Sequence, residues 1–209
     1  MTATYQTLAR EARGEVEDRG SRFLCRLAPT TSEEEARAVI EQERRAHHDA
    51  RHHCSAFILG PEGRVERSND DGEPAGTAGT PMLDVLRGSG YRDVTAVVTR
   101  WFGGTLLGAG GLVRAYGDAV RAALAQAHPR ELMLVQMHAL VVSHADAGRV
   151  ENDLRTQGVV VTGTDYGAEA TVHLAIPADD LDRVAHLVAA ATAGARSLVP
   201  GEQRWVDRA

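Results

Sequence analysis

The sequence contains no lysine, and all 23 of its basic side chains are arginines. Its 29 acidic residues leave a net charge of −6. This balance argues against strong nonspecific binding to nucleic acid, although arginines gathered on one face could still bind phosphate. A P-loop is excluded, because its glycine-rich stretch must be followed by a lysine.

Cysteine and long apolar runs are scarce as well. Cys25 and Cys54 are too few for a disulfide framework and lack the paired spacing of a zinc site, so we expect reduced, buried thiols. The longest apolar runs, such as Ala139–Val142 and Leu187–Ala191, fall far short of the roughly 20 residues of a membrane-spanning helix. No secretory signal opens the chain. These absences predict a cytoplasmic protein without contact with a membrane.

Aromatic residues make up only 4% of the chain, yet Trp101 and Phe102 are adjacent at the start of a glycine-rich stretch. This position favours packing over the glycines in a small core. The alternative is a role in stacking the bases of single-stranded nucleic acid.

The order of apolar patterns predicts two domains of α+β class, residues 1–130 and 131–209. The first begins with a strand at Ser21–Leu27 and a helix opened by a capping box of Ser32 and Glu35. The elements expected after these are strands at His53–Leu59, near Val65 and at Val94–Thr99, a loop at Ser68–Thr80, a helix from Pro81, and a helix at Leu112–Ala127.

The second domain follows Pro129 and Arg130 and has the order β-α-β-β-α-β, which is typical of the ferredoxin-like fold. Its expected elements are strands at Leu132–Ser143, Val159–Asp165, Ala168–Ile176 and Arg204–Val206, with helices at Ala145–Thr156 and Ala178–Ala193.

A glycine-rich segment between a strand and a helix is a frequent anion site, because free backbone N–H groups and the helix dipole point at the ligand. The interpretation that competes with it is a loop that needs positive φ values and tight packing. Arg100 and Arg114 bracket the segment and could face one anion. The glycines that would contribute are Gly103, Gly104, Gly108, Gly110 and Gly111.

Asp70, Asp71 and Glu73 form an acidic cluster whose register does not fit a calcium-binding EF-hand. Side chains that cap turns of a polar loop are favoured, and paired carboxylates with acid and base roles are the alternative. His48 and His52 precede a strand too closely to form a zinc-protease helix, and nothing supports Cys54 as a nucleophile. We expect neither a metal nor a cofactor.

Together these motifs are more specific than any one of them. The chain resembles the YigZ/IMPACT family in the segments Asp71–Pro74, Gly76–Gly79, Arg100–Gly104 and Leu107–Tyr116. The resemblance implies a first domain similar to the second domain of ribosomal protein S5, and a ferredoxin-like second domain similar to one of elongation factor G. Many members have a lysine where this chain has Leu106, so a possible phosphate contact is missing.

The resemblance favours a non-enzymatic protein that regulates translation by binding RNA, the ribosome or a regulatory protein. Its expected anion-binding residues are Arg100, Arg114, Tyr116 and the five glycines, beside a motif loop with Asp70, Asp71, Glu73 and Thr77. The alternative is an enzyme that acts on a phosphorylated or small acidic substrate at the same loops. The oligomeric state is left open.

Overall fold

The protein is described by a computed structural model that covers residues 3–208. Its contacts divide the chain into two compact units, one built mainly from residues 5–131 and the other from 132 onwards. The predicted domains, 1–130 and 131–209, differ from this division at the beginning of the chain, because Ala3 and Thr4 associate with the second unit. Neither unit contains, among the described residues, a helix long and apolar enough to cross a membrane.

The first unit is built on a five-stranded antiparallel sheet with the order β2-β3-β6-β4-β5. Its three central strands are mostly buried, whereas the two edge strands are more polar and partly exposed. The strands are β2 (Ala12–Asp18), β3 (Ser21–Pro29), β4 (His52–Leu59), β5 (Val65–Asn69) and β6 (Val94–Trp101).

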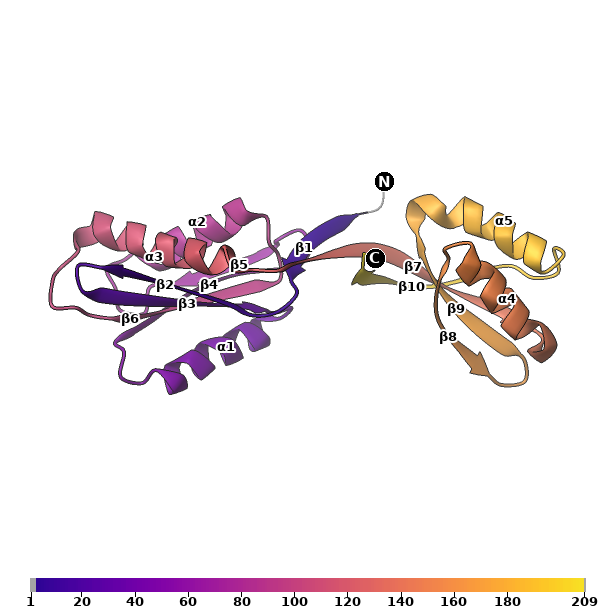
Figure 1. Cartoon of the computed structure of the whole chain (residues 1–209), viewed down its shortest axis with the longest axis horizontal. Coiled ribbons are helices and arrows are strands. Elements are labelled where there is room, and N and C mark those ends of the chain that lie inside the picture. The colour runs from indigo at the N-terminus through magenta and orange to yellow at the C-terminus, as the bar shows by residue number, and fades with distance from the viewer. Residues whose placement is uncertain (1–2, 209) are drawn as a thin grey trace. The chain divides into compact units, whose positions relative to one another are not determined.

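Three helices cover this sheet, with α2 (Gly79–Ser89) and α3 (Gly108–Leu124) on one face and α1 (Glu33–Ala46) on the other (Figure 1). The main core lies under α2 and α3 and includes Phe23 and Tyr116, both fully buried. Smaller apolar clusters lie under α1. Because helices cover both faces of the sheet, we looked for a functional site at the ends of the strands, where the loops emerge.

The predicted capping box is confirmed in part. Ser32 Oγ accepts the backbone N–H of Glu35 at 3.2 Å, as expected for the first residue of such a box. The Glu35 carboxylate, however, accepts the N–H of Thr31 at 2.6 Å, one residue earlier than predicted. The side chains of Ser32 and Glu35 thus hold the start of α1 in place.

The predicted start of α3 at Leu112 is wrong. The helix begins at Gly108, so Gly108, Gly110 and Gly111 form its first turn and only residues 102–107 form the loop. Glycine has low helix propensity, and a cluster of glycines is ordinarily interpreted as a loop. Here the packing of Leu112 and Ala115 on the sheet overrides that preference.

The second unit has the predicted βαββαβ order, and its sheet has the order β10-β7-β9-β8, with every pair antiparallel. One further strand, β1 (Thr4–Leu8), also pairs with β7. The other elements are β7 (Pro129–Val142), α4 (His144–Thr156), β8 (Val160–Tyr166), β9 (Ala170–Pro177), α5 (Leu181–Ala191) and β10 (Val199–Asp207).

Several boundaries in this unit differ from the prediction. Gly158 has φ +78° directly after α4, as expected for a glycine that ends a helix. The expected helix at Ala178–Ala193 is divided, because a 3-10 turn at Ala178–Asp180 precedes α5. The last strand is also longer than Arg204–Val206. Its first six residues, 199–204, are exposed and show no regular alternation of apolar and polar residues.

Candidate functional site

Asp70 closes the loop between β5 and α2. Its carboxylate accepts the backbone N–H groups of Gly76 at 2.8 Å, Ala78 at 3.0 Å and Gly79 at 2.8 Å. Partial burial acts to raise the pKa of Asp70, but these three donors outweigh it and hold the pKa below the ordinary value. Asp70 therefore has the structural role that was favoured, and it joins the loop to the start of α2.

Asp71 is also occupied by contacts within the protein. One carboxylate oxygen accepts from Arg44 at 2.9 Å and the other from the backbone N–H of His53 at 2.7 Å. Its own carbonyl oxygen lies 2.9 Å from Nδ1 of His52. Asp71 has φ +44°, followed by Gly72 at +86°, so this turn occupies the left-handed region at two successive residues.

Glu73 differs from both aspartates because it lies at the centre of a buried polar cluster. Its Oε1 accepts from Nη1 of Arg100 at 2.6 Å and from the hydroxyl of Tyr116 at 2.7 Å. The Glu73 and Arg100 side chains are only 4% and 7% exposed. Burial raises the pKa of Tyr116, so its hydroxyl stays protonated and donates. Nε2 of His52 lies 4.0 Å from the same oxygen.

The motif threonine, Thr77, contributes to the conformation of the loop. Its hydroxyl donates to the carbonyl oxygen of Pro74 at 2.6 Å, and its own backbone N–H reaches the same oxygen at 3.0 Å. The residue is buried. Thr77 therefore holds the segment after Glu73 in a tight turn.

Gly103 is required by a close approach of two backbones. A Cβ atom at this position would lie 1.8 Å from the carbonyl carbon of Gly20. The N–H of Gly103 donates to Oγ of Ser21 at 3.1 Å, which fixes the loop against the start of β3. Gly104 has φ +88° and open space around it. For these two glycines the structure agrees with the interpretation based on backbone conformation.

The loop after β6 borders a cavity of about 410 Å³. Glu73 and Arg100 form its buried wall, and the exposed side chains of Arg51, Phe102 and Leu106 lie around it. Phe102 and Leu106 are 46% and 82% exposed, so Phe102 is not part of the core as favoured from the sequence. The remaining residues that line the cavity are His52, Pro74, Leu107, Gly108, Ala109 and Leu112.

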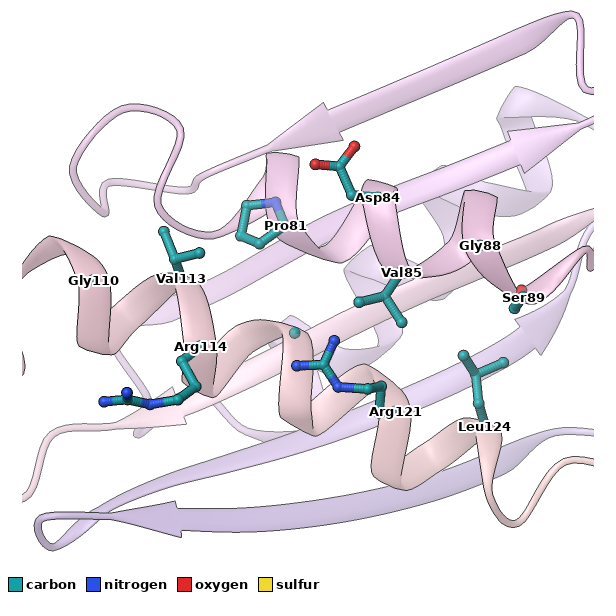
Figure 2. Close-up of a pocket in the computed structure, with 11 residues that line it drawn as sticks. Pro81, Asp84, Val85, Gly88, Ser89, Gly110, Val113, Arg114, Arg121 and Leu124 are labelled. Atoms are coloured by element: carbon teal, nitrogen blue, oxygen red, sulfur yellow. The ribbon is translucent and has the colours of Figure 1, made fainter.

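Arg114 does not line this cavity. It is exposed in a separate groove of about 710 Å³ between α2 and α3, together with Gly110, Val113 and Arg121 (Figure 2). Asp118, one helical turn after Arg114, accepts from Arg121 at 2.7 Å. Gly111 is buried against Leu107. The predicted anion-binding set is thus divided, because Arg100 and Gly108 line the cavity of about 410 Å³ whereas Gly110 and Arg114 line the other groove.

The site also contains residues that the sequence did not single out. Arg51 is exposed, and within residues 3–208 it forms no ion pair. In the sequence, Arg51 follows a mostly polar segment, and no pattern there indicates a functional role for it. Trp101 lies at the same strand end as Phe102, but its Nε1 donates to Asp49 at 2.8 Å and Arg22 lies 4.8 Å from its ring.

The two thiols are buried and free, as expected. Burial raises the pKa of Cys54, whose Sγ donates to the carbonyl oxygen of Asp70 at 3.0 Å. A protonated thiol that is engaged in this way is a poor nucleophile. The described part of the chain holds no group of three or more histidine, cysteine or acidic side chains that could bind a metal ion.

The residues that line this cavity lie within a part of the chain that matches a known family. Residues 19–124 match the Impact N-terminal domain, and residues 140–195 match a domain of unknown function, DUF1949. The chain is 33% identical over 209 residues to the IMPACT family member YvyE of Bacillus subtilis (strain 168), which covers 100% of this chain and 96% of the relative. This chain belongs to the IMPACT family.

Other members of the family support the assignment. The IMPACT family member YigZ of Escherichia coli (strain K12) is 42% identical over 160 residues, which is 76% of this chain and 78% of the relative. A crystal structure described as that of a hypothetical protein aligns with a TM-score of 0.68 and 36% identity, over 97% of this chain and 99% of the other. The family resemblance inferred from the sequence is therefore confirmed.

Proposed function

We propose that this protein is a non-enzymatic regulator of translation that binds RNA through the surface formed by Arg51, Phe102 and Leu106, here called the loop surface. The observation that carries the proposal is an exposed aromatic ring and an exposed arginine that forms no ion pair with any described residue, both at one cavity. An aromatic side chain can stack an unpaired base of any sequence, and an arginine binds the phosphate backbone. A role on the translation machinery places the protein in the cytoplasm.

The overall charge of −6 limits how this binding can work. A protein with a net negative surface gains little from the general attraction between basic residues and nucleic acid. Affinity therefore has to come from a few local contacts, among which stacking contributes about 1–3 kcal/mol per base. We accordingly propose weak, local binding to single-stranded RNA rather than coverage of a long duplex.

The test is the binding of labelled single-stranded RNA, and of ribosomes by sedimentation, over a series of salt concentrations. Phe102→Ala should weaken RNA binding by roughly 10-fold or more, because it removes one stacking platform. Arg51→Ala should weaken it and reduce the slope of log K against log salt by about 0.7. The matched control is Arg114→Ala, which removes the same charge from an exposed position in the other groove.

The control also distinguishes this surface from the set expected from the sequence. If Arg114→Ala weakens binding as much as Arg51→Ala, the loop surface is wrong. If neither RNA nor ribosomes bind the unmodified protein, the proposed function is rejected. Equal binding by the Phe102→Ala variant would reject base stacking at this site.

One observation favours the alternative enzyme function. The carboxylate of Glu73 and the ring of His52 lie 4.0 Å apart at the wall of a cavity, an arrangement that could move a proton on a small acidic substrate. Oε1 of Glu73 is nevertheless occupied by Arg100 and Tyr116. This function would be established if the protein turns over a phosphorylated compound and the His52→Ala variant does not. It would be rejected if the protein turns over no compound in a broad screen.

A further inference from the structure

The groove of about 710 Å³ between α2 and α3 is a second surface of the first unit (Figure 2). α3 lines it with residues three or four apart from Gly110 to Leu124, and α2 lines it with a similar stripe from Pro81 to Ser89. We call this surface the helix groove. The residues with which α3 enters the core, such as Ala119, are different ones. The helix groove is therefore additional to the surface by which α3 packs on the sheet.

The lining of the helix groove is mostly apolar. Val85, Val113 and Leu124 contribute aliphatic side chains, and Val113 is 42% exposed. Gly88 and Gly110 add no side chain, and a Cβ atom at either position would meet nothing within 4 Å. Neither glycine has a positive φ, so the described structure itself does not require glycine there. Such an apolar hollow on a protein surface is typical of a docking site.

The shape of the groove favours a helix as its occupant. Its walls are helices, which pair their own backbone groups and offer no sheet edge to a bound segment. An extended segment would therefore leave backbone N–H and C=O groups unpaired on an apolar surface, whereas a helix pairs them internally. The stripe from Gly110 to Leu124 is about 21 Å long, at about 1.5 Å per residue, so it matches a helix of about four turns.

The charges at the groove favour acidic residues on that helix. Asp84 accepts from Arg87 at 2.9 Å, and Asp118 accepts from Arg121 at 2.7 Å. Arg114 is exposed and forms no ion pair within residues 3–208. It is thus the charge of the lining that remains without a counter-charge, in a chain whose net charge is −6. A carboxylate beside the apolar stripe of the occupant would pair with Arg114, and a basic side chain would be repelled.

The other helices of the described chain are not available to fill this groove in a second copy. Each of them buries its apolar stripe against a sheet of its own unit, as Val39 of α1, Val150 of α4 and Val188 of α5 show. Within residues 3–208 no helix is therefore free to enter the groove of another molecule. This favours a different protein as the occupant.

We propose that the helix groove binds an amphipathic helix of a partner protein. The helix places aliphatic side chains against Val85, Val113 and Leu124 and an acidic side chain beside Arg114, in the mode of a helix bound in a groove between helices. The residues of the loop surface do not line the helix groove. The inference therefore goes beyond the proposed function and does not depend on RNA binding.

The test is selection from a library of helical peptides of about 14 residues, the length that matches the groove. Each peptide carries apolar residues at positions i, i+3, i+7 and i+10, and its flanking positions carry glutamate, glutamine or lysine in equal proportion. The peptides that bind the full chain should be enriched in glutamate, because of Arg114. Absence of any binding peptide, or enrichment of lysine, overturns the proposal.

The place of binding is tested at Gly88, which is exposed in the groove wall. Gly88→Leu fills the groove, so it should weaken a selected peptide by at least ~10-fold in fluorescence anisotropy. The control is Gly88→Ala, which adds only a methyl group and should retain most of the affinity. Leucine and alanine both favour a helix over glycine, so unfolding does not explain a loss. Unchanged binding by Gly88→Leu would place the peptide elsewhere and reject the groove.

The charge of the occupant is tested with Arg114→Glu. We expect a selected peptide to bind about 2-fold to 5-fold more tightly than its glutamine counterpart, the range for one exposed ion pair. Arg114→Glu should remove this preference. The control is Arg45→Glu, because Arg45 is also exposed on a helix and forms no ion pair with a described residue. If Arg114→Glu keeps the preference, the acidic character of the partner is wrong.

Sedimentation equilibrium distinguishes a partner helix from a second copy of the chain. We expect Gly88→Leu to leave the oligomeric state of the protein unchanged. A dimer of the unmodified protein that dissociates in Gly88→Leu would show that a second copy covers the helix groove, and the proposal of a partner helix would be overturned.

Discussion

Arg100 and Glu73 form a buried ion pair, with Nη1 and Oε1 2.6 Å apart, that joins the end of β6 to the loop before α2. Tyr116 of α3 donates to the same carboxylate oxygen. The loop before α2, β6 and α3 are thus held together by one acceptor. Arg100, which the sequence predicts to bind an external anion, is therefore neutralised by the carboxylate of Glu73.

Glu73→Gln should strongly destabilise the protein, because it leaves the Arg100 charge buried without a counter-charge. Removing one member of a buried pair costs about 3–5 kcal/mol in the free energy of unfolding. Urea denaturation measures the change. The control is Glu62→Gln in the exposed Arg64–Glu62 pair, which should change the free energy by less than about 1 kcal/mol. Similar values for the two variants would contradict this account of Glu73.

Asp70→Asn should destabilise the protein by about 0.5–2 kcal/mol at neutral pH, as for loss of a helix-capping side chain. Because the folded protein lowers the Asp70 pKa, this carboxylate contributes fully above its ordinary pKa of 3.8 and loses its contribution as the pH falls through the lower folded value. The stability difference between wild type and Asp70→Asn should therefore shrink below pH 3.8. A constant difference across denaturation curves down to acidic pH would rule out the ionised carboxylate as its cause.

Gly103→Ala and Gly110→Ala should have opposite effects on stability. The Cβ of the first would lie 1.8 Å from the carbonyl carbon of Gly20, so the loop after β6 must move away from β3. The Cβ of the second meets nothing within 4 Å in a helical segment, where alanine is favoured by roughly 0.5–1 kcal/mol. Thermal unfolding of both variants provides the comparison, and a neutral Gly103→Ala would show that the two backbones do not approach so closely.

Much of the fold could be predicted from local patterns. The central strands of the first unit are rich in apolar residues, and the βαββαβ order of the second follows from alternating patterns and Gly158. Strands β1 and β2 were not predicted, because both are short, polar edge strands with little apolar pattern; β1 pairs with the distant β7 and β2 with the adjacent β3. The start of α3 was missed for a related reason, since packing outweighed the low helix propensity of three glycines.

The candidate site was predictable as a set of segments but not as a set of contacts. The motifs singled out Glu73, Arg100 and Tyr116, whereas the burial of these three side chains against one another depends on how β6, α3 and the acidic loop meet. The distinction between Arg100 and Arg114 depends on the direction of each side chain relative to α3. Likewise, Glu43 is 1% exposed beside Arg26, which nothing in the charged pattern of α1 indicates.

The pairing of β1 with β7 has a consequence for synthesis of the chain. The backbone N–H of Leu134 donates to the carbonyl oxygen of Ala3 at 2.9 Å, so the second unit includes residues that are synthesised before the first unit and residues that are synthesised after it. Until Leu134 emerges, the beginning of the chain has no strand to join there, while the first unit has all of its own strands. A truncation that begins at residue 140, where the second family match begins, would remove both this strand and most of its partner.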